Sequence, residues 1–304
     1  MSELSKRVLF AVVAAPLAIA AVLLGGASLA ALLAIAAAVG AWEFFRIARA
    51  AGHAPFDTAG IALAGLVPLV VHAHYLGLWT LPLSVAAVLV LAIMAAAIWF
   101  RGVAGKPLGA AATTLMGVVY TGVMLSFAYG VRYHDVTRWY EGVAGIASPS
   151  LPQWMQRVAP GGWLLLLPLV VTWGSDIGAY FVGRAFGKAK LIPSVSPGKT
   201  RAGALGALAA SVLLTWLIVR FVLRPAISVG MTPIGIVAFG LAISVAAQVG
   251  DLFESLLKRE SGVKDSSKLL PGHGGVLDRV DSLLFVLPVA YLLLDHILVY
   301  APAR

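Results

Sequence analysis

The sequence predicts an all-α integral membrane protein with about nine transmembrane helices and polar active-site loops at the cytoplasmic edge of the membrane. Only 12% of the 304 residues are charged, and the mean hydropathy is +0.95, whereas soluble domains carry about 25% charged residues. Apolar runs of about 20 residues recur along the chain, and each is long enough as a helix to cross roughly 30 Å of hydrocarbon. The alternating pattern of barrel strands is absent, and a helix satisfies its own backbone hydrogen bonds in lipid.

Nine apolar segments are the expected spans. In chain order they are residues 8–24, 27–45, 61–76, 81–100, 108–129, 163–181, 204–222, 233–257 and 283–300. The boundaries near residues 61 and 108 are the least sharply defined. Lys6 and Arg7 precede the first run as they would in a signal peptide, but the run is long and another follows almost at once, so we expect a retained first helix.

Residues 1–130 are expected to form an N-terminal transmembrane scaffold. They are rich in Ala, Leu and Val, and small residues let transmembrane helices approach closely. Glu43 lies near a helix end, from which it can reach the interface, and we do not expect it to be catalytic. Residues 131–304 are the expected catalytic region, which opens with an outer loop whose Trp139, Tyr140 and Trp154 suit the membrane interface.

The net charge of +9 reflects membrane topology rather than a nucleic-acid partner. With nine spans, most Lys and Arg residues fall on one side of the membrane, and cytoplasmic loops collect these residues. This asymmetry places the N-terminus and the loop after Leu257 in the cytoplasm, and it favours an odd number of spans. The chain has no cysteine, which excludes a disulfide framework and a thiolate metal site.

Asp251 is the first candidate site residue. It lies inside the apolar segment 233–257, where an aspartate costs roughly 2.5–3.5 kcal/mol to insert. Asp251, Glu254, Ser255 and Lys258 share one helix face by their spacing, and that face must point into protein or water. Intramembrane carboxylates are functional candidates by default. The alternative is a structural ion pair with Lys258 or a loop arginine.

Asp278 and Asp281 stand three residues apart just before the last span, so in a helical turn they face the same way. With Asp251 they would supply three carboxylates near the cytoplasmic interface. Mg²⁺ favours such oxygen ligands, together with waters and substrate phosphates. The alternative is that the two interfacial aspartates form salt bridges with Arg279 and Lys268.

The segment 271–275, Pro-Gly-His-Gly-Gly, is expected to be a loop. Its glycines allow positive φ and a close approach of the backbone to a ligand, and successive backbone N–H groups can bind an anion. We interpret His273 as a substrate contact or a residue that orders the site rather than as a metal ligand. Histidine metal sites usually recruit further His or Cys, and the other histidines lie elsewhere.

A second polar cluster occupies residues 175–200. Asp176 lies near the end of a span, and the sequence Gly198-Lys199-Thr200 imitates the end of a phosphate-binding loop. The full motif needs a glycine five residues before Gly198, and Pro193 stands there. We therefore reject a P-loop and retain Lys199 and Thr200 as residues that can hold a phosphate.

Lys188 and Lys190, in the same cluster, have an alternative explanation in the positive-inside rule. Taken together, the chain has two basic, glycine-containing loops on one side of the membrane and several carboxylates at the membrane edge. This combination indicates metal-assisted phosphoryl or nucleotidyl transfer to a substrate held in the bilayer.

Residues 255–281 follow a long and specific pattern. It reads Ser255-x-x-Lys258-Arg259-x-x-x-x-Lys264-Asp265-x-Ser267-x-x-Leu270-Pro271-x-His273-Gly274-Gly275-x-x-Asp278-Arg279-x-Asp281, and it resembles the signature of phosphatidate cytidylyltransferases, also called CDP-diacylglycerol synthases. The upstream residues Ser175-Asp176, Gly183-Arg184 and Ser196-Pro197-x-Lys199-Thr200 are similar to that family in the same order. The resemblance covers about residues 165–300 well. One position departs, because Ala202 stands where the family usually has a glutamate.

The resemblance implies the reaction CTP + phosphatidate → CDP-diacylglycerol + pyrophosphate, in phospholipid biosynthesis at a bacterial cell membrane. It implies Mg²⁺, with a second cation left open, at Asp176, Asp251, Asp278 and Asp281. The implied catalytic residues are Asp251, Asp278, Asp281, Lys258, Arg279 and His273. The implied substrate-binding residues are Ser196, Lys199, Thr200, Arg259, Lys264, Asp265, Lys268, Gly274 and Gly275. CTP and bilayer phosphatidate are the implied partners, and the family resemblance also implies a homodimer.

Three other classes compete with this interpretation. Polytopic helices with charged groups also describe carriers of anions, but here the charges gather at one membrane edge and no repeat pairs the two halves. A lipid kinase would release a nucleoside diphosphate rather than pyrophosphate. A CDP-alcohol phosphotransferase is disfavoured because its Asp-Gly-x-x-Ala-Arg pattern is missing from the chain.

Overall fold

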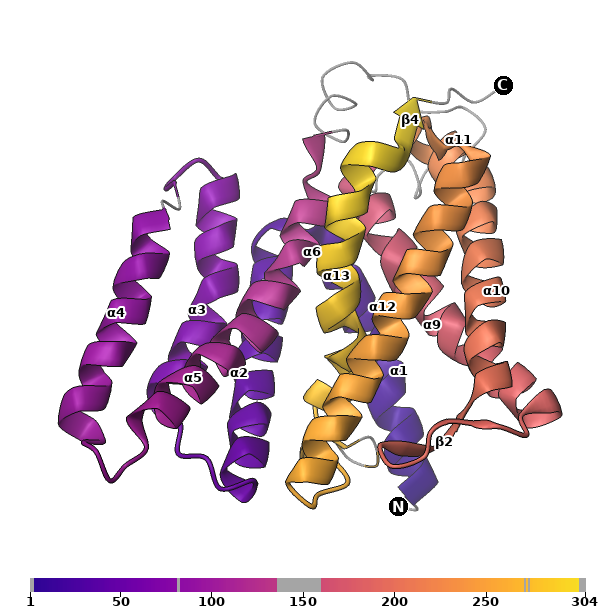
Figure 1. Ribbon diagram of the computed structural model, residues 1–304. Coiled ribbons are helices and arrows are strands. Elements are labelled where there is room, and N and C mark those ends of the chain that lie inside the picture. The colour runs from indigo at the N-terminus through magenta and orange to yellow at the C-terminus, as the bar shows by residue number, and fades with distance from the viewer. Residues whose placement is uncertain (1–2, 81–82, 136–159, 271, 273, 301–304) are drawn as a thin grey trace. The chain divides into compact units, whose positions relative to one another are not determined.

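The computed structural model describes residues 3–80, 83–135, 160–270, 272 and 274–300. The helices (Figure 1) are α1 (Glu3–Leu24), α2 (Gly26–Ala50), α3 (Asp57–Tyr75), α4 (Leu83–Phe100), α5 (Pro107–Gly117), α6 (Met124–Arg132), α9 (Pro160–Phe186), α10 (Arg201–Ile218), α11 (Arg224–Ile227), α12 (Pro233–Glu260) and α13 (Leu277–Ile297). Two π-helical turns, η1 (Val118–Val123) and η2 (Val219–Leu223), continue α5 into α6 and α10 into α11. The strands are β1 (Lys190–Ile192), β2 (Ser196–Thr200), β3 (Val229–Met231) and β4 (Leu298–Tyr300). His273 and the aromatic residues of the expected outer loop lie outside the described residues.

Seven helical stretches in the described part of the chain are long and apolar enough to cross a membrane. They are Gly26–Ala50, Asp57–Tyr75, Pro107–Arg132, Pro160–Phe186, Arg201–Ile227, Pro233–Glu260 and Leu277–Ile297. Two shorter apolar helices, Val12–Leu24 and Ser84–Phe100, lie at the first and fourth expected spans. Each of the nine expected segments therefore falls on a helix, and the chain is an all-α, multi-pass integral membrane protein.

The last helix differs from its expected bounds at both ends. It begins at Leu277, six residues earlier than expected, so that Asp278 and Asp281 lie within its first turns. A carboxylate in a first turn interacts favourably with the free N–H groups and the positive end of the helix dipole. At the other end, residues 298–300 form β4 instead of helix.

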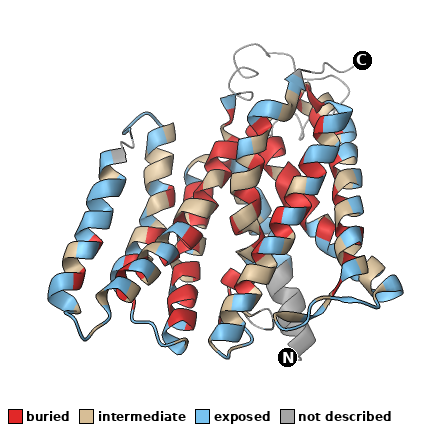
Figure 2. Ribbon diagram, in the orientation of Figure 1, coloured by how far each residue is buried: buried red, intermediate tan, exposed pale blue. Residues whose placement is uncertain are grey.

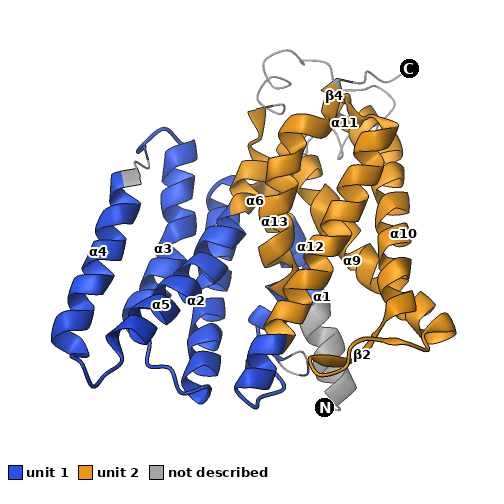
Figure 3. Ribbon diagram, viewed as in Figure 1, with its two compact units in different colours: residues 1–19, 26–126, 256–280 blue, residues 20–25, 127–255, 281–304 orange. Residues whose placement is uncertain are grey.

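The chain divides into two compact units (Figure 3). Unit 1 comprises residues 1–19, 26–126 and 256–280, and unit 2 comprises residues 20–25, 127–255 and 281–304. Residues 256–280, which carry most of the signature, therefore belong with the N-terminal spans. The expected functional division at residue 130 stays a prediction.

Small residues organise the interior of unit 1. Helix α2 packs against α3, and both contact η1. Phe45 of α2 is fully buried, and its ring lies against Gly60 of α3 and Gly117 of α5, where a Cβ atom would collide with it. The absence of side chains at these two positions is what leaves room for the ring, in keeping with the close packing that small residues allow.

Helix α4 presents a different surface. It packs on α5, and of its described residues Ile93 and Ala97 are buried while most others are exposed, including Val88 and Leu91 (Figure 2). Exposed aliphatic side chains on an apolar helix of a membrane protein suit contact with lipid tails, which are as apolar as leucine.

In unit 2, α9 and α10 pack against each other along their lengths. Gly178 of α9 faces Gly206 of α10, and a Cβ atom on either would lie 2.9 Å from the carbonyl oxygen of the other. The β1–β2 hairpin connects these helices, with Lys190 opposite Thr200. Strand β3 pairs with β4 at the other end of the unit (Figure 1). The close contact of α9 with α10 thus positions the hairpin between their ends.

We expect Gly206→Ala to destabilise the protein by about 1–3 kcal/mol, the usual cost of an extra methyl group in a tightly packed interior. The added Cβ would lie 2.5 Å from Val182 Cβ and 2.9 Å from Gly178 O. The control is Gly109→Ala in α5, where a Cβ meets nothing within 4 Å. Melting temperatures in one detergent check the prediction. Equal values for the two variants would contradict it.

Candidate active site

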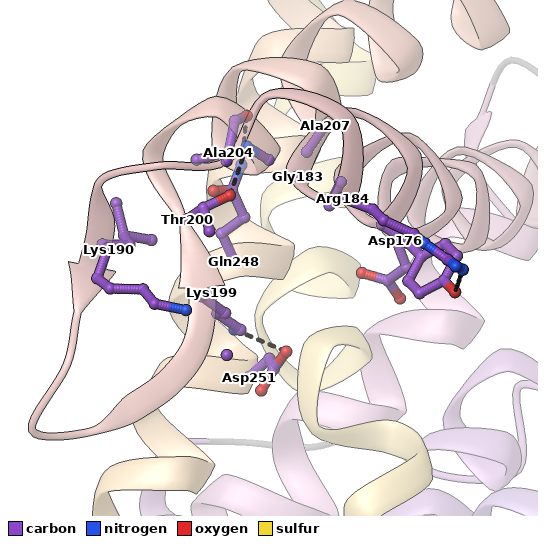
Figure 4. Close-up of a pocket in the computed structure, with 16 residues that line it drawn as sticks. Asp176, Gly183, Arg184, Lys190, Lys199, Thr200, Ala204, Ala207, Gln248 and Asp251 are labelled. Atoms are coloured by element: carbon purple, nitrogen blue, oxygen red, sulfur yellow. Dashed lines mark hydrogen bonds and ion pairs between the residues drawn. The ribbon is translucent and has the colours of Figure 1, made fainter.

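A cavity of about 380 Å³ that contains several charged side chains lies beneath the β1–β2 hairpin of unit 2 (Figure 4). Its walls come from α9, the hairpin, the first two turns of α10 and the second half of α12. They bring together the carboxylates of Asp176 and Asp251, the cations of Arg184, Lys190 and Lys199, and the polar side chains of Tyr180, Thr200 and Gln248. Four predicted site residues, Asp176, Asp251, Lys199 and Thr200, therefore line one cavity.

Thr200 opens α10 at the edge of this cavity. Its Oγ1 accepts a hydrogen bond from Gly203 N at 3.1 Å, which is the usual contact of a helix N-cap. Gly183 of α9 lies against it, and a Cβ there would be 3.0 Å from Thr200 Oγ1. The positive end of the α10 dipole thus points to the cavity, where it favours an anion. Ser196, which was also predicted to bind substrate, lies at the other end of β2.

Lys199 reaches from the hairpin to α12. Its Nζ lies 2.7 Å from Asp251 Oδ2, and the two side chains are 26% and 36% exposed. Ser255 Oγ is 3.4 Å from the other carboxylate oxygen. An ion pair with this exposure contributes about 0–1 kcal/mol, so a phosphate or a cation can exchange with either partner at little cost. The alternative pairing of Asp251 with Lys258 is not the one that the structure shows.

Asp176 and Asp251 approach the cavity from neighbouring helices (Figure 4). Among the described residues, no three or more His, Cys, Asp or Glu side chains gather in the way that an all-protein metal site requires. The pair still fits Mg²⁺, which takes one or two carboxylates and completes its shell with waters and substrate phosphates. The metal assignment stays a prediction.

Gln248 is a lining residue that the sequence reasoning missed. Its Nε2 lies 3.2 Å from Ser244 Oγ and 3.5 Å from Ala204 O. Ser244 in turn lies 3.0 Å from Ser175 Oγ in the interior of the unit. The spacing of Gln248 and Asp251, three residues apart on one helix, was the signal available in the sequence.

Asp281 lies in unit 2, at a close contact between α12 and α13. A Cβ atom on Gly250, the residue before Asp251, would lie 2.7 Å from Asp281 O and 3.0 Å from Ser282 Cα. The carboxylate of Asp281 accepts a hydrogen bond from Ser282 N at 2.6 Å. The backbone segments that carry Asp251 and Asp281 are therefore neighbours, and the role of Asp281 as a metal ligand stays a prediction.

Asp278 belongs to unit 1, where it is surrounded by donors. Its Oδ1 accepts a hydrogen bond from Lys258 Nζ at 2.7 Å, with the two side chains 7% and 13% exposed. Its Oδ2 accepts hydrogen bonds from Ser266 Oγ at 2.9 Å, Ser266 N at 3.0 Å and Gly275 N at 2.8 Å. These contacts hold the loop that precedes α13, so Asp278 and Lys258 order the signature whether or not they also contact a ligand.

Glu43 is the second residue that the sequence reasoning missed. It is fully buried in α2, and its carboxylate accepts hydrogen bonds from Ser266, Ser267, Val276 and Leu277. Its partners lie 223 to 234 residues further along the chain. No local pattern signals a contact at such a separation.

The other predicted substrate residues divide by exposure. Gly275 is buried and Gly274 partly buried, and a Cβ on Gly274 would lie 2.5 Å from Asp278 Oδ2. These two glycines therefore allow the loop to pack closely. The charged members are exposed in unit 1, and they are Arg259, Lys264, Asp265, Lys268 and Arg279.

Sequence comparison with known proteins identifies the family of this chain. A model of the cytidylyltransferase family matches residues 5–297. The chain is 37% identical over 292 residues to a phosphatidate cytidylyltransferase of Pseudomonas aeruginosa, which covers 94% of this chain and 95% of that protein.

Two further relatives carry the same name. One, from Synechocystis, is 31% identical over 295 residues, which are 94% of this chain and 95% of that protein. The other, from Haemophilus influenzae, is 44% identical over 146 residues, which are 48% of this chain and 50% of that protein. With a family match over nearly its whole length and relatives that align with almost all of it, this chain belongs to the cytidylyltransferase family.

Proposed function

We propose that this protein is a phosphatidate cytidylyltransferase, as its relatives are named. In this reaction a phosphate oxygen of phosphatidate forms a bond to the α-phosphorus of CTP. The bond from that phosphorus to the bridging oxygen of the β-phosphate breaks, and pyrophosphate leaves. The products are CDP-diacylglycerol and pyrophosphate.

The observation that carries this proposal is the cavity beneath the hairpin. A lysine side chain, the start of a helix and two carboxylates share it, and they are Lys199, the first turn of α10, Asp176 and Asp251. Cations and the positive end of a helix dipole suit a triphosphate. Stabilising charge on a transferring phosphoryl group is the main task of enzymes of this class.

No strong general base is required for this reaction, because the attacking lipid phosphate is already ionised at pH 7. The carboxylates are therefore available as metal ligands. Asp176 and Asp251 are the residues that we propose for Mg²⁺, with Asp281 and Asp278 as the further candidates. When bound, Mg²⁺ supplies positive charge that stabilises the transferring group and the leaving pyrophosphate.

The remaining parts of the proposal rest on charge distribution and resemblance. The excess of Lys and Arg supports a cytoplasmic position for the hairpin and for the loop that precedes α13, where CTP is available. Lys264 and Lys268, exposed on that loop, are further candidates for phosphate contacts. The homodimer implied by the resemblance is part of the same proposal.

The reaction is tested by the products that the purified protein forms from CTP, phosphatidate and Mg²⁺ in detergent. We expect ³¹P NMR to show pyrophosphate and a new diphosphate diester, with no product when any of the three components is omitted. Formation of a nucleoside diphosphate would indicate a lipid kinase instead. A folded protein that forms neither pyrophosphate nor a nucleoside diphosphate would favour the alternative function, a carrier of anions.

Lys199→Met is expected to lower kcat/KM by about 100-fold or more, the usual effect of losing one donor that stabilises the charge of a transition state. The control is Lys188→Met, because Lys188 is exposed and precedes the hairpin. Single exposed charges contribute little, so the control should retain nearly full activity. Rates of pyrophosphate release decide. Equal losses of kcat/KM in the two variants would show that Lys199 has no special role in the reaction.

Asp251→Asn is expected to raise the Mg²⁺ concentration for half-maximal activity by more than about 10-fold. Losing a direct ligand should cost at least as much as losing an outer partner, which typically costs 10–100-fold. Asp135→Asn, at an exposed position, is the matched control. Titration of activity with Mg²⁺ measures the shift. An unchanged midpoint in Asp251→Asn would exclude Asp251 as a ligand.

A further inference from the structure

A buried carboxylate in α2 holds the signature loop, which we define as the described residues between α12 and α13, namely 261–270, 272 and 274–276. We infer that Glu43 is a positioning residue, whose carboxylate sets the conformation of the signature loop and of the first turn of α13, and thereby the affinity for CTP. This inference rests on the proposed function. Glu43 itself lies in the N-terminal spans, 223 residues before Ser266.

The Glu43 carboxylate accepts hydrogen bonds from four groups, one of which, the Ser266 hydroxyl, shares its single hydrogen with Asp278 Oδ2. Oε1 accepts them from Ser267 Oγ at 2.5 Å and Val276 N at 3.0 Å. Oε2 accepts them from Leu277 N at 2.6 Å and Ser266 Oγ at 3.1 Å. Because Glu43 is 0% exposed, bulk water has no access to replace a lost donor. A buried carboxylate is costly without such partners, so Glu43 and the loop depend on each other.

The four donors come from both ends of one segment. Ser266 and Ser267 lie in the first half of the loop. Val276 is the last residue of the loop, and Leu277 is the first residue of α13. Ser267 and Val276, which flank the segment between them, therefore both donate hydrogen bonds to a single side chain. Backbone N–H groups at the start of a helix have no partner within that helix. Because Glu43 accepts a hydrogen bond from Leu277 N, the first residue of α13, it also caps the N-terminus of this helix.

Ser266 extends the network to the predicted catalytic pair. Its hydroxyl lies 2.9 Å from Asp278 Oδ2 as well as 3.1 Å from Glu43, and Asp278 accepts from Lys258. Gly275 packs against both Ser266 and Glu43, and a Cβ atom at this position would collide with Ser266 Oγ and with the Glu43 carboxylate. A displaced Glu43 would consequently disturb Asp278 and Lys258 together.

Neither close substitute reproduces this arrangement. Glutamine keeps the length of Glu43 but replaces one acceptor oxygen with an NH₂ group, which cannot accept from the backbone N–H of Val276 or Leu277. Aspartate keeps both acceptors but is one methylene shorter, so it can serve only some of the donors. We therefore expect Gln to loosen the loop more than Asp does.

The test compares Glu43→Gln with Glu260→Gln, an exposed glutamate at the end of α12. Both full-length variants are purified in detergent, and their melting temperatures are compared with wild type. We expect the KM for CTP of Glu43→Gln to rise about 10-fold or more, the usual loss when a partner that orients a site residue is removed. Glu43→Asp should recover part of the loss, and Glu260→Gln should match wild type. A partly inactive preparation would instead lower kcat at unchanged KM.

Limited proteolysis reports on the loop without relying on activity. Lys268 is exposed and precedes Leu269, and Lys190 of the hairpin is exposed and precedes Leu191. Cleavage follows local opening. We expect trypsin to cut after Lys268 several-fold faster in Glu43→Gln than in wild type, with cleavage after Lys190 unchanged.

A folded Glu43→Gln with a wild-type KM for CTP, or with unchanged cleavage after Lys268, overturns the inference. If Glu43→Gln does not fold, Ser267→Ala removes one donor and should shift both measurements in the same direction by less. Wild-type values in Ser267→Ala would then count against the inference. No pyrophosphate release from the wild-type protein would contradict the proposed function instead, and faster cleavage after Lys268 in Glu43→Gln would still support the anchoring of the loop.

Discussion

A carboxylate near the end of a membrane-spanning helix must be matched by donors or by a cation, and this constraint organises the polar regions of both units. An unmatched buried charge costs several kcal/mol, whereas one hydrogen bond contributes about 1 kcal/mol. Lys199 matches Asp251 in unit 2. In unit 1, Lys258 matches Asp278 and four donors match Glu43. The hairpin and the signature loop are thus held to the helices by polar partners.

The two ion pairs differ in exposure, and this difference separates their tasks. Lys199 and Asp251 are 26% and 36% exposed, so their pairing is weak and both groups can turn to a ligand. Lys258 and Asp278 are 13% and 7% exposed, and removing one partner of such a buried pair costs about 3–5 kcal/mol. The first pair is suited to binding and the second to holding a loop in shape.

Composition and local spacing predict the positions of the helices and part of the cavity lining. All nine apolar segments fall on helices, because a span of about 20 apolar residues is visible without any tertiary contact. Lys199, Thr200, Asp176 and Asp251 line one cavity. Gln248 also lines the cavity, but a single neutral amide within an apolar span is a weaker signal in a sequence than the charged Asp251.

Local sequence patterns do not predict which charged residues form ion pairs or hydrogen bonds with each other. The spacing of Asp251 and Lys258 on one helix allowed them to pair, yet each found a partner on another element. The position of Glu43 near a helix end predicts that it reaches the interface, whereas the structure buries it. Its four partners lie more than 220 residues away.

The sequence by itself therefore determined the class of protein and the positions and order of its apolar helices, since these follow from hydropathy, and its signature and charges identified four of the residues that line the cavity. Only the tertiary structure decided which charges meet, that Asp278 orders a loop, and that an N-terminal helix anchors the signature. Those outcomes depend on which helices pack closely enough to bring distant donors and acceptors within about 3 Å of each other.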